Sequence, residues 1–105
     1  MDYIRNKIIY VDIDGVICTN EGTDYKKARP IEENIKLINE LYKNNKIVIW
    51  TARGTLMEED FKELTEKQLR DWGVKYHELL FGKPYYDILI DDRSISDFRQ
   101  LQKKN

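Results

Sequence analysis

The stretch 7–17, KIIYVDIDGVI, decides the fold of this chain, because an apolar run ends there in two aspartates and a glycine. Residues 8–11 are continuously apolar, which predicts a strand buried on both faces. Such a strand delivers Asp12 and Asp14 to its carboxyl end, where α/β sheets usually bind ligands. Two anions at that edge repel each other unless a positive group lies between them, so the pair also indicates that a positive group binds there.

Three further apolar runs predict additional strands. Residues 47–50 form a second buried run, and residues 76–81 form a weaker one. Residues 86–91 predict a stronger strand, in which Ile88, Leu89 and Ile90 are buried.

Segments in which apolar residues recur with the helical period lie between the expected strands. Apolar residues recur with the helical period over residues 31–42. Thr55 and Glu58 match a capping box, so a second helix should begin near Thr55 and end at Gly73. Residues 95–101 predict a final helix. Strands that alternate with helices favour a three-layer α/β/α, Rossmann-like domain with a mainly parallel sheet, covering residues 1–105.

Composition and charge narrow the class of protein. With 105 residues, 41% of them hydrophobic, the chain predicts one globular domain. A net charge of −1 gives no electrostatic argument for nucleic acid or an anionic membrane as a partner. Cys18 is the single cysteine, which excludes an intramolecular disulfide and fits a reducing cytoplasm. No apolar run is long enough to cross a lipid bilayer, so we expect a soluble, cytoplasmic protein without a membrane partner.

Polar residues follow three of the expected strands. Asp12 and Asp14 follow the first, Thr51 follows the second, and Asp91 and Asp92 follow the last. Because the carboxyl ends of parallel strands meet at one edge of a sheet, we expect these residues to converge. Two unit charges 4 Å apart repel by roughly 4 kcal/mol at an effective dielectric constant of 20. Carboxylate oxygens favour Mg²⁺, which is therefore the expected cofactor.

The order of these motifs resembles a known family. The run Asp12-Ile13-Asp14-Gly15-Val16, Thr51 after an apolar strand, Lys83, and the pair Asp91-Asp92 are similar to the four motifs of haloacid dehalogenase (HAD)-like phosphohydrolases. All four occur in the order of that family, and their supporting segments cover most of the chain. The resemblance implies a Mg²⁺-dependent phosphatase.

The resemblance also implies a role for each motif. Asp12 would be the nucleophile that forms an aspartyl-phosphate, and Asp14 would act first as general acid and then as general base. Thr51 would hydrogen-bond the phosphoryl group, and Lys83 would steady Asp12 and that group. By the same resemblance, Mg²⁺ would be held by Asp12, the Asp14 backbone carbonyl and one or both of Asp91 and Asp92.

The expected substrate site centres on the turn after residues 47–50. Thr51, Ala52, Arg53 and Lys83 are the candidate substrate-binding residues, and Arg53 is left open between a phosphate contact and a surface ion pair. Neither interval between the motifs is long enough for a cap domain. A sheet edge without a cap domain suits a phosphate on a large or extended molecule, such as a polysaccharide-pathway sugar phosphate or a polynucleotide end. Completion of the site by a second copy of the chain stays open.

Three alternative functions stay open as well. A receiver-like regulatory module also uses acidic residues, a threonine and a lysine, but it needs a phospho-accepting aspartate before the threonine. A silent HAD-like protein would bind a phosphorylated ligand without turnover. A phosphotransferase would pass the group to an acceptor other than water. A cysteine phosphatase is excluded, because the arginine needed six positions after Cys18 is replaced by Asp24.

Overall fold

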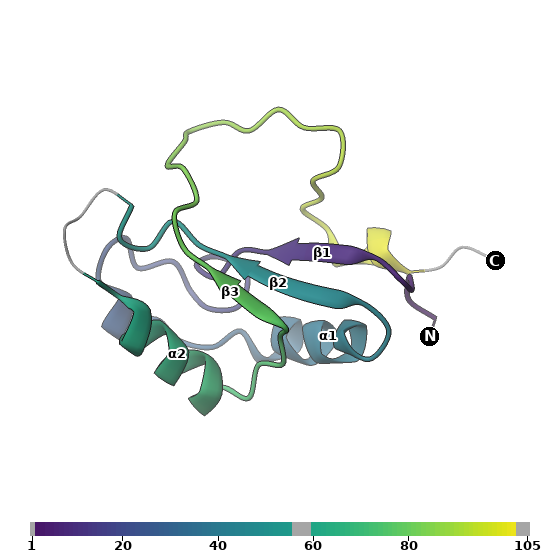
Figure 1. Cartoon of the computed structure of the whole chain (residues 1–105), viewed down its shortest axis with the longest axis horizontal. Helices are drawn as coiled ribbons and strands as arrows, with labels where there is room; N and C mark the ends of the chain where they lie inside the picture. Colours follow the sequence, from purple (N-terminus) through teal and green to yellow (C-terminus); the bar gives the residue numbers. More distant parts are fainter. Residues whose placement is uncertain (1, 56–59, 103–105) are drawn as a thin grey trace.

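The computed structural model describes residues 2–55 and 60–102. Strands and helices alternate along this part of the chain (Figure 1). The elements are β1 (Ile8–Val11), α1 (Glu32–Tyr42), β2 (Lys46–Trp50), α2 (Lys62–Asp71) and β3 (Glu78–Leu80), with short 3₁₀ turns η1 (Tyr25–Lys27) and η2 (Phe98–Leu101). The strands form a three-stranded parallel sheet in the order β1-β2-β3. The α/β class, the parallel sheet and the Rossmann-like arrangement are therefore confirmed.

Both α-helices lie on one face of this sheet (Figure 1). Each strand is placed beside the one before it in the same direction, and right-handed crossovers then put both connecting helices on the same side. Asn39 of α1 donates a hydrogen bond to the carbonyl of Gly73, just beyond α2, at 2.9 Å. Within residues 2–55 and 60–102, the expected second layer of helices is not formed.

The hydrophobic core lies between the two helices and the sheet face that they cover. Val11, Ile47 and Ile49 are buried on that face, and Ile38 and Leu69 are buried on the helices. Alternate residues of β1 point the other way, and Ile8 stays 69% exposed. The prediction that β1 is buried on both faces is wrong, because only one face has a helical cover.

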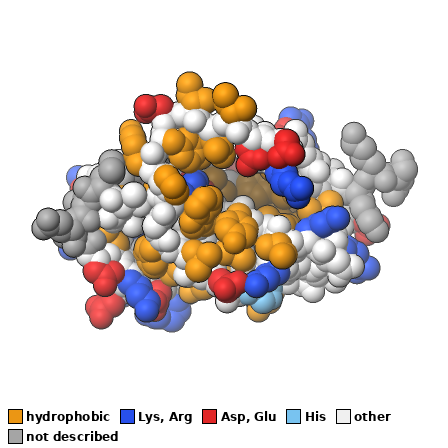
Figure 2. Space-filling model, turned by 45° about the horizontal axis from the view of Figure 1, so that its top comes forward, with side chains coloured by type: hydrophobic (Ala, Val, Ile, Leu, Met, Phe, Trp, Pro, Cys, Tyr) orange, Lys and Arg blue, Asp and Glu red, His pale blue; other side chains and the backbone are white. Residues whose placement is uncertain are grey.

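The expected strand over residues 86–91 is not formed. The chain after β3 arches away from the sheet before it returns at η2 (Figure 1). Ile90 is 95% exposed, and apolar side chains gather on this side of the molecule (Figure 2). The correction has a physical reason: an apolar run favours a strand, but the hydrogen bonds of a strand need a partner backbone that the run itself does not specify.

The helix boundaries follow the sequence pattern in part. α1 ends at Tyr42, as predicted. α2 begins at Lys62 and not near Thr55, whose hydroxyl donates to the carbonyl of Lys83 at 2.8 Å. Glu58, the other half of the expected capping box, lies outside the described residues. The predicted final helix is reduced to η2.

No helix among the described residues is long and apolar enough to cross a bilayer.

Candidate functional site

The ends of the three strands meet at one edge of the sheet and carry the candidate site. Asp12 follows β1, Thr51 follows β2, and Lys83 lies shortly after β3. The backbone N–H of Thr51 donates to the carbonyl of Leu80 at 3.0 Å, and the N–H of Lys83 donates to the carbonyl of Thr51 at 3.1 Å. These bonds extend the pairing of β2 with β3, and they bring Lys83 to the edge where Asp12 lies.

Asp12 and Lys83 form an ion pair at this edge. Lys83 Nζ lies 3.2 Å from Asp12 Oδ2, and the backbone N–H of Ile13 donates to Asp12 Oδ1 at 2.8 Å. The Lys83 side chain is 13% exposed and that of Asp12 is 39% exposed. The rings of Trp50 and Tyr86 flank the ammonium, with centroids 5.6 and 5.4 Å from Nζ. The carboxylate of Asp12 is therefore accessible from outside while its charge is balanced from within.

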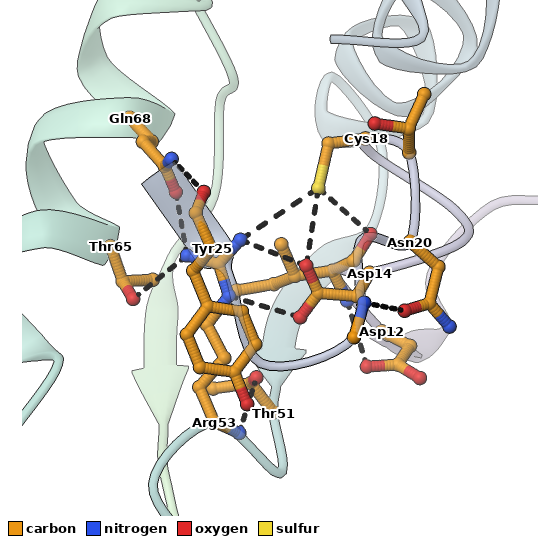
Figure 3. A network of polar contacts seen from close by, with 12 residues as sticks. Asp12, Asp14, Cys18, Asn20, Tyr25, Thr51, Arg53, Thr65 and Gln68 are labelled. Atoms are coloured by element: carbon orange, nitrogen blue, oxygen red, sulfur yellow. Dashed lines mark hydrogen bonds and ion pairs between the residues drawn. The ribbon is translucent and has the colours of Figure 1, made fainter. Parts of the chain in front are cut away.

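Asp14 is held by Arg53 (Figure 3). Arg53 Nε donates to Asp14 Oδ2 at 3.0 Å, and Arg53 Nη2 donates to Asp14 Oδ1 at 2.9 Å. Two parallel bonds of this kind match the fork of a guanidinium to the two oxygens of a carboxylate. The Arg53 side chain has no exposed surface, and that of Asp14 is 17% exposed.

The remaining donors of Arg53 are taken by its neighbours. Nη1 donates to Thr65 Oγ1 at 3.1 Å and to Gln68 Oε1 at 2.6 Å, both on α2. Nη2 donates a second, longer bond to Cys18 Sγ at 3.8 Å. The guanidinium carbon lies 4.6 Å from the centre of the Tyr25 ring, a cation–π distance. All five N–H donors of Arg53 thus have partners inside the protein.

This burial corrects the expectation for Arg53. The residue forms an ion pair, but the pair is internal and not on the surface. No donor is left over for a phosphate in this arrangement, so Arg53 binds Asp14 and not a substrate.

Cys18 belongs to the same network. The tight turn after β1 brings it back to Asp14, because the N–H groups of Ile17 and Cys18 both donate to the carbonyl of Ile13. Cys18 Sγ donates to Asp14 Oδ1 at 3.4 Å. Burial, and then the negative charge of Asp14, raises the pKa of Cys18 to about 12. The side chain is a protonated donor at neutral pH and not a thiolate nucleophile.

Thr51 is buried at the centre of the edge, with 1% of its surface exposed. Its Oγ1 accepts a hydrogen bond from the backbone N–H of Arg53 at 3.1 Å. This bond shapes the turn through Ala52, which is partly exposed. Thr51 therefore lies where the sequence predicted. Its hydrogen bond with the Arg53 N–H stabilises the turn that leads from β2 to Arg53.

Asp91 and Asp92 do not join the other carboxylates. Both are exposed on the segment after β3, where the backbone N–H of Arg93 donates to Asp91 Oδ1 at 2.9 Å. That bond, the first of several causes, lowers the pKa of Asp91. No group of three or more His, Cys, Asp or Glu side chains in the described part of the chain is placed to hold a metal ion. The residues as arranged here do not fit the Mg²⁺ site implied by the resemblance.

Three residues of the network were not singled out from the sequence. Tyr25 lies in the polar loop before α1, and Thr65 and Gln68 lie on α2. The signal for the last two was a pair of polar residues at helical spacing beside the buried Leu69, on the inner face of α2. A buried polar pair on a helix needs a partner, and Arg53 supplies it.

Comparisons with known proteins support the fold. No family model matches the sequence, and no curated protein matches it. A crystal structure of an MCSG target from Vibrio cholerae is similar to this chain, with a TM-score of 0.77 and 24% sequence identity, over 90% of this chain and 93% of that one. At this identity the likeness shows a shared α/β fold.

Proposed function

We propose that this chain is a HAD-like phosphatase that hydrolyses phosphomonoesters through an aspartyl-phosphate on Asp12. The observation that supports it best is the meeting of Asp12, Thr51 and Lys83 at the carboxyl edge of a parallel sheet, with Lys83 Nζ 3.2 Å from Asp12 Oδ2. These are the residues that the family resemblance assigns to the nucleophile, the phosphoryl contact and the supporting lysine.

In the first step, a carboxylate oxygen of Asp12 attacks the phosphorus. Before this step, Asp14 takes up a proton from solvent, to which its side chain is 17% exposed. An Asp12–phosphorus bond forms as the bond between phosphorus and the leaving oxygen breaks, and Asp14 gives its proton to that oxygen. Lys83 stabilises the charge on the phosphoryl oxygens, because its ammonium lies at the same edge and is only slightly exposed.

In the second step, water attacks the aspartyl-phosphate. Asp14, now unprotonated, takes a proton from the water as its oxygen bonds to phosphorus. The bond between Asp12 and phosphorus breaks, which releases inorganic phosphate and restores both aspartates. Asp14 has access to solvent for this exchange, since its side chain is 17% exposed.

Dependence on Mg²⁺ is a prediction that the resemblance makes. No step above is routed through the metal, because Asp91 and Asp92 lie on an exposed segment apart from the other two carboxylates. Lys83 and Arg53 balance the charge of Asp12 and Asp14 in the present arrangement. Measuring phosphate release with and without Mg²⁺ tests the requirement directly.

The expected substrate is a phosphate on a large or extended molecule. The edge that carries Asp12 lacks a helical cover among the described residues, and the intervals between the motifs hold α1 and α2. A polysaccharide-pathway sugar phosphate and a phosphorylated polynucleotide end are the two classes to compare. Efficient hydrolysis of a small free sugar phosphate by the monomer would contradict this choice.

The test is phosphate release from sugar phosphates, nucleotides and phosphorylated polynucleotide ends. Asp12→Asn should abolish release, because the amide keeps the shape but loses the attacking charge. Asp14→Asn should slow release by about 10²–10⁴-fold, the usual size of acid–base assistance. Asp71→Asn is the matched control, since this exposed aspartate pairs with Lys67 on α2, and it should leave the rate unchanged.

Two results would reject the proposal. Wild-type rates in Asp12→Asn would show that the nucleophile is wrong. Binding of inorganic phosphate by calorimetry, with no release from any substrate, would favour the silent phosphate-binding alternative.

A further inference from the structure

We propose that Arg53 is a positioning residue that aims the Asp14 carboxylate and ties its orientation to α2 and to the loop around Tyr25. This inference rests on the proposed function, because it concerns the aspartate assigned to proton transfer. The sequence suggested that Arg53 contacts phosphate or forms a surface ion pair, and neither alternative includes this role.

The first argument is the way in which the carboxylate is held. Arg53 binds both oxygens of Asp14 with two hydrogen bonds of 2.9 and 3.0 Å (Figure 3). A single hydrogen bond leaves a carboxylate free to rotate, whereas a fork of two bonds sets its plane. The side chain of Arg53 is fully buried, so the orientation of Asp14 is set from inside the protein.

The second argument is the support behind the guanidinium. Gln68 and Thr65 hold Nη1 from α2, and the Tyr25 ring lies against the guanidinium. Gln68 Nε2 in turn donates to the backbone carbonyl of Tyr25 at 2.7 Å. α2 and the Tyr25 loop therefore hold Arg53 together, and Arg53 has little freedom to follow Asp14 if that carboxylate turns.

The third argument concerns which oxygen can carry the proton. Asp14 Oδ1 accepts from both Arg53 and Cys18, whereas Oδ2 accepts only from Arg53 Nε among the described residues. A carboxylate oxygen has two lone pairs, so Oδ2 keeps one for a proton. The clamp thus assigns proton transfer to Oδ2 and holds that oxygen in a constant direction.

The experiment compares two substrates that differ in leaving group, phenyl phosphate and p-nitrophenyl phosphate, through kcat/KM. A general acid matters for the poor leaving group, phenolate, and much less for the good one, p-nitrophenolate. Arg53→Lys keeps the charge but loses the fork. We expect it to lower kcat/KM by about 10²-fold for phenyl phosphate, the scale of a small misplacement of a catalytic group, and far less for p-nitrophenyl phosphate.

A double variant separates positioning from a purely structural effect. If Arg53 acts through Asp14, adding Arg53→Lys to Asp14→Asn costs nothing more for phenyl phosphate. Arg99→Lys is the matched control, because Arg99 makes a similar fork with Asp97. No hydrogen bond or ion pair among the described residues joins Arg99 to Asp12, Asp14 or Lys83, so this variant should change neither rate. If Arg53→Lys does not fold, Gln68→Leu removes one support of Nη1 and should give the same leaving-group pattern with a smaller loss.

The outcomes also separate this inference from the function on which it rests. Equal losses on both substrates, or losses that add in the double variant, would overturn the positioning role while an inactive Asp12→Asn keeps the function intact. A folded wild type that releases phosphate from neither aryl phosphate, nor from any sugar phosphate, nucleotide or phosphorylated polynucleotide end, would overturn both.

Discussion

Two arginine–aspartate forks in this molecule have nearly the same chemistry and very different surroundings. Arg53 binds both oxygens of Asp14 inside the protein, whereas Arg99 binds both oxygens of Asp97 with 84% of its side chain exposed. The first pair joins residues 39 positions apart, and the second joins residues two positions apart. The buried fork therefore holds the tertiary structure together, whereas the exposed one only shapes a local turn.

The physical difference is the cost of breaking each pair. Water replaces the partner of an exposed charge, so exposed pairs contribute little to stability. A buried charge that loses its partner has no such replacement. The forks are thus a matched pair within one chain, and they separate hydrogen-bond geometry from burial.

The largest expected effect comes from removing each arginine in turn. Arg53→Ala leaves Asp14, Thr65 and Gln68 without their shared partner, and should lower the free energy of unfolding by about 3–5 kcal/mol. Arg99→Ala should leave the unfolding midpoint nearly unchanged, since its fork is solvated. Urea denaturation followed by circular dichroism measures both. Similar losses in the two variants would mean that burial is not what distinguishes the forks.

A smaller effect is expected from the thiol beside the buried fork. The pKa of Cys18 is raised to about 12, so the folded protein keeps the proton that the unfolded chain releases near pH 9. The resulting stability is full below about pH 9 and is lost as the pH rises toward 12, by about 1.4 kcal/mol for each pH unit. Wild type should therefore lose more stability than Cys18→Ala between pH 8 and pH 11. Parallel curves would contradict the burial of the thiol.

The smallest effect concerns the exposed fork in acid. Hydrogen bonds from the Arg99 side chain lower the pKa of Asp97, so its contribution is present above the ordinary value for aspartate and is lost as the pH falls. Thermal unfolding at pH 7 and pH 3 should show a slight difference between wild type and Asp97→Asn. Because the pair is exposed, 1 M salt should remove that difference. A difference that survives in salt would show that this fork is less solvated than its exposure indicates.

The candidate site was predicted unevenly from the sequence. Asp12, Asp14 and Thr51 were singled out because polar residues that follow buried strands meet at one edge. Lys83 was singled out by the family resemblance, and in the structure it forms an ion pair with Asp12. Asp91 was expected there for the same reason, but its strand is not formed. The difference is one of pairing: β3 pairs with β2 and carries Lys83 to the edge, whereas residues 86–91 pair with no strand.

Which residues partner one another in the network behind Asp14 was out of reach of sequence patterns. Thr65 and Gln68 have ordinary polar side chains, and nothing along the chain says that they face an arginine twelve and fifteen positions earlier. Only packing of α2 against the turn after β2 brings them together. The same holds for Cys18, which becomes part of the network because the turn after β1 folds back on itself.

The sequence by itself determined the class of fold, since continuous apolar runs and helical patterns reflect local burial and alternate in an order that favours a parallel sheet. It also determined which residue types stand at the strand ends. The tertiary structure alone decided that Arg53 is internal, that β1 is covered on one face only, and that Asp91 stays apart from Asp12. The reason is that local patterns record how each segment meets solvent or core, whereas contacts between distant segments depend on which backbones pair and which faces pack.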